Sequence, residues 1–173
     1  MTRWPALLAA PIAVFSPAAM ATVYLSVEQA QQAIFPGGRF AAAPVSLTDE
    51  QKRAIEKRAG AKAGSSPQVW KVADGGWFIV DQVIGKHELI TYAVGLDASG
   101  SVRGIEVLEY LESYGQQIRY DSWRKQFVGK KAADPVKLDE DILNISGATL
   151  SCRHVTEGVR RLLALHEVVL RQR

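Results

Sequence analysis

The stretch that decides the fold is "ELITYAVGLDASGSVRGIEVLEY", residues 88–110. Apolar residues alternate with other residues on both sides of a turn sequence, Asp97-Ala98-Ser99-Gly100. A period of two residues is typical of β-strands, and a cluster of Asp, Ser and Gly is typical of the turn between them. One alternating face consists of Ile90, Tyr92, Val94 and Leu96. Two similar stretches come before it, "VWKVA" at 69–73 and "GWFIVDQVI" at 76–84, so the sequence predicts an antiparallel meander.

Helical patterns precede the predicted strands. "SVEQAQQAIF", residues 26–35, and "LTDEQKRAIEKRAG", residues 47–60, each contain Ser or Thr followed three residues later by Gln. This spacing is typical of a capping box at the start of a helix. We therefore expect two short helices, the first starting at Val27 and the second stopping at Gly60.

The clearest helix lies near the carboxyl end. Its apolar stripe, at spacings of three and four residues, consists of Cys152, Val155, Val159, Leu162, Leu163, His166, Val169 and Leu170. Such a stripe must pack against the sheet. The predicted fold class is α+β, an antiparallel sheet with helices packed on one side and this last helix starting at a Ser-Gly-Ala-Thr motif. Cys152 is the only cysteine, so it cannot form an internal disulfide and is expected in the core.

The first residues are typical of a secretory signal peptide. "MTRWPALLAAPIAVFSPAAMA", residues 1–21, has a positive charge at Arg3, a short apolar run and Ala-Met-Ala at its end. The run is well below the roughly 20 residues that a membrane-spanning helix needs. We expect cleavage after this segment, a periplasmic location and one mature domain at 22–173. Within that domain, 22–68 is a helical region and 69–173 holds the sheet, a loop and the last helix.

The charge of the chain argues against nucleic acid as a partner. Arg3 is the only basic residue of the first segment, so cleavage leaves 20 of the 21 basic residues against 18 acidic ones, a net charge of +2. Binding to phosphate backbones needs a concentrated basic surface, which such a balance does not indicate.

The last helix opens with "ISGATLS", residues 145–151. Ser and Thr are among the commonest residues at helix starts, so Ser146 or Thr149 acting as a cap, with Gly147 permitting a tight approach, is one interpretation. The other is a binding site. A helix amino terminus presents unpaired N–H groups and about half a positive charge, which favour an anion.

Three segments occur in an order that resembles the FMN-binding domain family. They are "YAVGLDASGSVRGIEVLEYLESYG" at 92–115, "WRKQFVGK" at 123–130 and "ISGATLS" at 145–151. This family is shared by the small flavin subunits of sodium-pumping quinone reductase and Rnf-type complexes and by many exported single-domain proteins. The resemblance implies one covalent FMN per chain, joined by a phosphoester to Thr149. It also implies a magnesium-dependent flavin transferase, which takes FMN from FAD and releases AMP.

The resemblance further implies which residues surround the cofactor. Near the phosphate these are Ser146, Gly147, Ala148, Thr149, Leu150 and Ser151, and near the isoalloxazine ring they are Glu112, Ser113, Tyr114 and Gly115. Glu112 would disfavour negative charge on the reduced ring and lower its potential. Tyr114 either offers its ring to the flavin or packs a turn. No metal ligand is expected. The chain departs from the family at Leu143, where an acidic residue is usual, and the nearest acid is Asp141.

Two other features have both a structural and a functional interpretation. Trp123 and Phe127 are four residues apart, and we expect this pair in the core rather than at the cofactor. His154 falls in the first turn of the last helix, where it either donates to the flavin phosphate or faces solvent.

These features predict an exported electron carrier whose redox chemistry resides in FMN. A membrane cytochrome or another quinone-linked or periplasmic redox protein is the partner that the family analogy implies. Two alternatives stay open. One is a flavin-dependent reductase of a small substrate, which needs an acid or base beside the ring. The other is a cofactor-free exported binding module in which the motif is only a helix cap.

Overall fold

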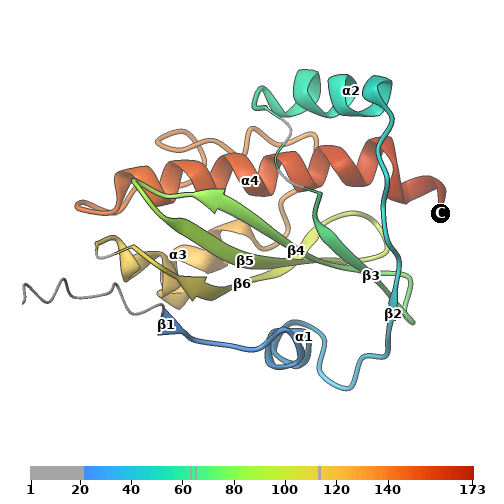
Figure 1. Ribbon diagram of the computed structural model, residues 1–173, viewed down its shortest axis with the longest axis horizontal. Helices are drawn as coiled ribbons and strands as arrows, with labels where there is room; N and C mark the ends of the chain where they lie inside the picture. The colour runs from blue at the N-terminus through green and yellow to red at the C-terminus, as the bar shows by residue number, and fades with distance from the viewer. Residues whose placement is uncertain (1–21, 63, 65, 113) are drawn as a thin grey trace, which may run out of the picture.

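The computed structural model describes residues 22–173 except 63, 65 and 113. In this part of the chain six strands form one antiparallel sheet, in the order β1-β6-β5-β4-β3-β2 (Figure 1). The strands are β1 (Thr22–Val23), β2 (Phe40–Ala42), β3 (Gln68–Val72), β4 (Trp77–Ile84), β5 (Leu89–Leu96) and β6 (Val102–Tyr110). The predicted meander is β3 to β6, each paired with the next. The predicted signal peptide, residues 1–21, lies outside the described residues.

The helices begin and end where the sequence predicts. In α1 (Val27–Ile34) and α2 (Asp49–Ala59) the side chains of Ser26 and Thr48 accept the N–H of the third helical residue at 3.2 Å. α2 stops at Gly60, whose φ of 59° is the left-handed conformation typical of a helix end. The remaining elements are α3 (Asp121–Arg124), α4 (Thr149–Val168) and the short 3₁₀ turns η1 (Gln116–Arg119), η2 (Lys125–Phe127) and η3 (Leu170–Gln172). The α+β class is confirmed, and α4 starts at the motif.

Helices cover both faces of the sheet. α2 and α4 lie on one face and α1 lies on the other (Figure 1). Tyr92 and Val94 belong to the core under α4, whereas Phe78 belongs to a second core under Phe35 at the end of α1. The expectation of helices on one side therefore holds for α2 and α4 but not for α1. Strands that are buried on both faces carry nearly continuous apolar runs, and "WFIV" at the start of β4 is one.

α4 is the central element of the larger core. Its predicted apolar stripe is buried, and Cys152 is a free, buried thiol within it. No helix within the described ranges is both long enough and apolar enough to cross a membrane.

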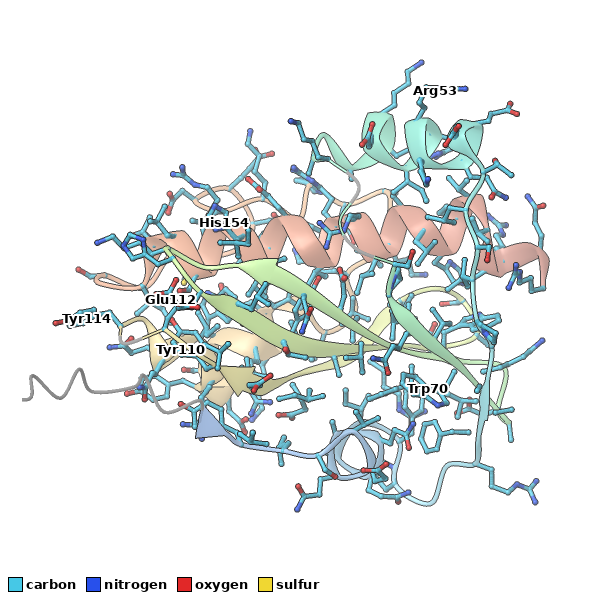
Figure 2. All side chains as sticks on the ribbon, in the orientation of Figure 1. Arg53, Trp70, Tyr110, Glu112, Tyr114 and His154 are labelled. Atoms are coloured by element: carbon cyan, nitrogen blue, oxygen red, sulfur yellow. The ribbon has the colours of Figure 1, made fainter. Side chains whose placement is uncertain are left out.

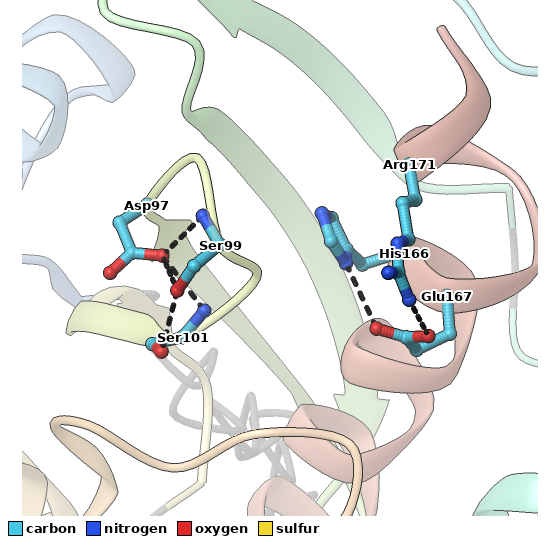
Figure 3. Close-up of polar contacts among 6 residues, drawn as sticks. All are labelled: Asp97, Ser99, Ser101, His166, Glu167 and Arg171. Atoms are coloured by element: carbon cyan, nitrogen blue, oxygen red, sulfur yellow. Dashed lines mark hydrogen bonds and ion pairs between the residues drawn. The ribbon is translucent and has the colours of Figure 1, made fainter.

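The carboxyl end of α4 packs against the β5–β6 turn (Figure 3). Asp97 closes this turn by accepting the N–H groups of Ser99 and Ser101 at 2.8 and 3.0 Å. His166 lies so close to the turn that a side chain on Gly100 would place its Cβ 2.4 Å from the imidazole ring. The ring is 3% exposed, which confirms its predicted place on the apolar face of the helix.

The segment between β6 and α4 packs as part of the fold. Trp123 and Phe127 are buried, with ring centroids 5.0 Å apart, so this pair is in the core as predicted. The Asp141 carboxylate accepts from the Lys130 ammonium at 2.8 Å and from the Lys137 N–H at 2.7 Å. Burial raises the pKa of Asp141, but these donors outweigh burial and leave the pKa below its ordinary value. The Asp141 carboxylate thus stabilises this loop.

Candidate functional site

The motif forms a tight turn followed directly by α4. The N–H of Ala148 donates to the carbonyl of Ile145 at 2.9 Å, and Gly147 inside this turn has a φ of 83°. Residues other than glycine rarely adopt this conformation, because their Cβ makes it unfavourable. Ala148 is the N-cap of α4, Thr149 is the first helical residue, and no side chain among the described residues caps the helix. The interpretation of Ser146 or Thr149 as a helix cap is therefore wrong, because the N-cap position is Ala148, which has no side-chain oxygen.

The first turn of α4 consequently has no side-chain acceptor for its N–H groups in the described part of the chain. It also contains no acidic residue. Free N–H groups and the helix dipole together favour an anion at this position. The start of α4 lacks both kinds of negative partner that helices usually carry, and a phosphate group would supply one.

The hydroxyl of Thr149 contacts an amide. Nδ2 of Asn144 donates to Oγ1 of Thr149 at 3.0 Å. An amide does not take up a proton, so this contact orients the hydroxyl but does not make it a nucleophile. Activation of Thr149 within the described residues would need a different group.

A cleft of about 560 Å³ lies in front of the motif. Its walls are residues 86–88 of the β4–β5 turn, residues 111, 112 and 114 after β6, and residues 147–151 at the start of α4. Figure 2 shows the side chains of Glu112 and Tyr114 at the same end of the molecule as the start of α4. The structure thus brings together two groups of predicted site residues that lie more than thirty positions apart in the sequence.

Not every predicted residue forms a wall of the cleft. Ser146 is exposed outside it. Gly115 lies behind it with a φ of 91°, where a Cβ would meet the hydroxyl oxygens of Tyr110 at 2.6 Å and Ser151 at 2.8 Å. Ser113 lies outside the described residues. Gly115 is therefore required for close packing of the loop against α4 rather than for contact with a ligand.

A hydrogen-bond chain joins the first turn of α4 to the loop after β6. The hydroxyl of Tyr110 donates to the carbonyl of Tyr114, and it lies 2.8 Å from Oγ of Ser151. Because the single phenolic proton goes to the carbonyl, Ser151 is the donor to Tyr110. Burial raises the pKa of Tyr110, so its hydroxyl keeps this proton at neutral pH. Ser151 is thus turned toward the interior.

Glu112 joins the same loop to the β4–β5 turn. Its carboxylate is 9% exposed and accepts the backbone N–H groups of His87 and, at 2.9 Å, of Glu88. Burial raises the pKa of Glu112, but the backbone donors of the turn outweigh it and leave the pKa below its ordinary value. Glu112 is therefore charged at neutral pH, and it approaches the turn so closely that a Cβ on Gly85 would lie 2.7 Å from its oxygen.

His154 takes neither of its two expected roles. Its Nδ1 lies 2.9 Å from the carbonyl oxygen of Gly85, so Nδ1 carries the proton and donates to that oxygen. The ring is half-buried and lines a neighbouring cavity of about 670 Å³ rather than the cleft of the motif. His154 is a second tie between α4 and the β4–β5 turn. Within the described ranges, no group of three or more His, Cys, Asp or Glu side chains is placed to hold a metal.

Three contributions to the site were missed in the sequence: Tyr110, Asn144 and the β4–β5 turn. Asn144 directly precedes the motif at 145–151, so its position in the sequence could have indicated a role at the site. Tyr110 ends an alternating strand, but nothing local indicates a partner on α4. The turn lies almost sixty positions before the motif, and only the register of β4 and β5 brings it to the cleft.

The site has the parts of a binding site for a phosphate-bearing cofactor: a helix amino terminus without a cap, and beside it a cleft within the usual size range of small-molecule sites, about 300–1,000 Å³. The family model of the FMN-binding domain matches residues 85–164. These residues contain every wall of the cleft, and they belong to the FMN-binding domain family. The chain is a flavin-binding protein with FMN as its cofactor. A comparison with curated proteins finds no match for the chain.

Proposed function

We propose that this protein is an exported flavoprotein that carries FMN covalently on Thr149 through a phosphoester and transfers electrons outside the cytoplasm. The observation that carries the proposal is the start of α4. Thr149 is the first residue of a helix without a cap and lies on the wall of the cleft. A phosphate on its hydroxyl would lie in the field of the helix amino terminus, where a single negative group is stabilised by about 0.3–1 kcal/mol or more.

The turn before Thr149 is open enough for a modifying enzyme. A Cβ placed on Gly147 would find no atom within 4 Å, and the residue faces solvent. A larger residue would protrude there and would also be strained by the positive φ. Gly147 thus supports access of a second protein to the hydroxyl.

Attachment requires an external catalyst. The hydrogen-bond partner of the Thr149 hydroxyl is the amide of Asn144, which is not a base. We assign the activation to a magnesium-dependent flavin transferase that uses FAD as donor, and this chain is its substrate.

The cleft walls suit an isoalloxazine ring. Bound flavin supplies one- and two-electron redox chemistry, while the protein tethers and orients it. Tyr114, which is 82% exposed, presents an aromatic ring at the edge of the cleft. The charged Glu112 disfavours additional negative charge nearby. An exposed cofactor edge suits exchange of electrons with a membrane cytochrome or a quinone-linked protein, and the apolar segment at 1–21 supports export to the periplasm.

Intact mass of the mature protein tests the proposal. The chain is expressed with and without a flavin transferase, next to Thr149→Ala and to Thr156→Ala, whose hydroxyl is buried in the same helix and donates to the carbonyl of Cys152. We expect one added FMN in the wild type and in Thr156→Ala only when the transferase is present, and none in Thr149→Ala. The proposal is wrong if the wild type gains no mass with an active transferase, or if Thr149→Ala gains the same mass.

A further inference from the structure

We propose that Asn144 is a positioning residue for FMN attachment, which donates from its amide to the Thr149 hydroxyl before the reaction and to the phosphate afterwards. The inference rests on the proposed attachment at Thr149. In that reaction Oγ1 of Thr149 forms a bond to the phosphorus of the FMN half of FAD. The pyrophosphate P–O bond breaks, AMP leaves, and the hydroxyl proton passes to a base of the transferase.

The backbone beside Asn144 is fixed on both sides. The carbonyl of Leu143 accepts from the indole N–H of Trp123 at 2.9 Å, and the N–H of Leu143 donates to Oε1 of Gln126 at 2.7 Å. Trp123 is a buried core residue. On the other side, the hydrogen-bonded turn that follows leads directly into α4. The side chain of Asn144 therefore spans the motif turn from one anchored point to another.

The contact has a direction that matters chemically. Nδ2 of Asn144 is the donor, so Oγ1 of Thr149 uses one lone pair as acceptor and keeps its own proton and a second lone pair for the reaction. Threonine has few accessible χ1 rotamers, and a donor at 3.0 Å selects one of them. Asn144 thus presents the hydroxyl in one orientation at the wall of the cleft.

The same amide gains a stronger acceptor once the ester exists. The non-bridging phosphate oxygens are anionic, and hydrogen bonds to ionised acceptors are roughly twice as strong as neutral ones. Asn144 and the free N–H groups of the first turn of α4 would then hold the phosphate from two sides. The side chain of Leu143, next to Asn144, is apolar and 71% exposed, so the residue beside this neutral donor adds no negative charge.

A purely structural role for Asn144 makes a different prediction. If the contact only held the turn together, an acceptor at this position would serve equally well, because the Thr149 hydroxyl can donate to it. Asn144→Asp has nearly the same shape, supplies acceptors only and repels phosphate. The comparison of Asn144→Ala with Asn144→Asp therefore separates bracing of the turn from donation to the reacting group.

The experiment measures the initial rate of FMN attachment by intact mass, with purified transferase, magnesium and FAD, together with the Tm of each variant. Asn144→Ala should slow attachment by about tenfold to a hundredfold, which corresponds to one lost hydrogen bond to a charged group. Asn144→Asp should be at least as slow, although its Tm stays near that of the wild type. Gln82→Ala removes a side-chain hydrogen bond to the Thr91 hydroxyl, and neither residue lines the cleft or contacts the motif segment. This control should change the rate less than about twofold, because groups without shared partners act independently.

A second measurement follows the finished ester. Flavinylated wild type and flavinylated Asn144→Ala, prepared by long incubation, are held at alkaline pH, and release of FMN is followed by fluorescence. The variant should lose FMN faster, because its phosphate has lost a donor.

The outcomes separate this inference from the proposed function. If wild type gains FMN at Thr149 while both Asn144 variants react at the wild-type rate, only the role of Asn144 is refuted. The same holds if Asn144→Asp restores the rate that Asn144→Ala loses, or if the control Gln82→Ala is as slow as Asn144→Ala. If the wild type gains no FMN, or if the Thr149→Ala variant still gains FMN, both proposals are refuted.

Discussion

Replacing Glu112 with glutamine is expected to loosen the cleft without changing its shape. The Glu112 carboxylate accepts the N–H groups of His87 and, at 2.9 Å, of Glu88, and so joins the loop after β6 to the β4–β5 turn. Both N–H groups donate to the same carboxylate oxygen, Oε1. Glutamine fills the same volume and can keep an oxygen there, but it carries no charge, so both bonds become weaker bonds between neutral groups. Both walls that depend on Glu112 should become more mobile.

The size of the effect follows from the two hydrogen bonds. A bond to a charged group contributes about 1.5–3 kcal/mol to stability, and a bond between neutral groups about 1 kcal/mol. Exchanging the carboxylate for an amide should therefore lower the free energy of unfolding by about 1–3 kcal/mol at neutral pH. At about 2–4 °C for each kcal/mol in a domain of this size, Tm should fall by several degrees.

The pKa of Glu112 determines how the stability difference between wild type and Glu112→Gln changes with pH. The pKa of Glu112 lies below its ordinary value of 4.5, so the fold favours the charged carboxylate. Its contribution is complete above the ordinary pKa and disappears as the pH falls through the lower pKa of the folded state. The difference in stability between wild type and Glu112→Gln should be largest near neutral pH and should shrink in acid.

Urea unfolding at pH values from neutral to acidic measures this difference, with flavin-free and flavin-loaded protein. Glu109→Gln is the matched control, because Glu109 lies near the end of β6, three residues before Glu112, and the side-chain hydrogen bond that it accepts, from the Thr91 hydroxyl, is long at 3.4 Å. The control should stay within about 0.5 kcal/mol of wild type. Equal destabilisation by both substitutions, or a difference that grows as the pH falls, would refute the reasoning.

Three further predictions concern other ties in the fold. Tyr110→Phe removes the hydroxyl that links α4 to the loop after β6. We expect the free energy of unfolding to fall by about 1–2 kcal/mol and hydrogen exchange at Gly115 to become faster. Tyr120→Phe, at an exposed site, should leave both quantities unchanged. Gly158→Ala places a Cβ 2.2 Å from the Tyr92 hydroxyl, so we expect the free energy of unfolding to fall by about 1–3 kcal/mol. The double variant with Tyr92→Phe should recover part of this stability. Additive losses in a double-mutant cycle would contradict the prediction. Burial lowers the pKa of His166, so wild type should lose stability as the pH falls below the ordinary value of 6.5. In His166→Gln the midpoint of urea unfolding should change less with pH across that range.

The elements that the sequence predicted well depend on neighbouring residues. Both capping boxes need only Ser or Thr and a Gln three residues later, and the observed bonds at Ser26 and Thr48 close within one turn of helix. The strands of the meander alternate over a few residues, and their short turns force antiparallel pairing. The motif turn was also predictable, because Gly147 has the φ that its position requires.

The parts that were not predicted depend on contacts between distant residues. The side on which α1 packs depends on the cluster that Phe35 shares with Phe78, more than forty positions away. Neither Ser146 nor Thr149 caps the helix, because the turn closes from Ile145 to Ala148 and makes Ala148 the N-cap residue, so that the helix begins at Thr149. No pattern along the chain reveals such competition between a turn and a helix.

The architecture of the cleft explains how connections between elements can form a well-defined binding site. The β4–β5 turn is held by two hydrogen-bonding groups from different elements, Glu112 after β6 and His154 on α4. The loop after β6 is held to α4 by Tyr110. Each wall is therefore tied to at least one other wall through interior polar groups that do not have to rearrange when a ligand arrives. Preorganisation of this kind lowers the entropic cost of binding, and it leaves the first turn of α4, with its free N–H groups, as the part of the site that still lacks a partner of opposite charge.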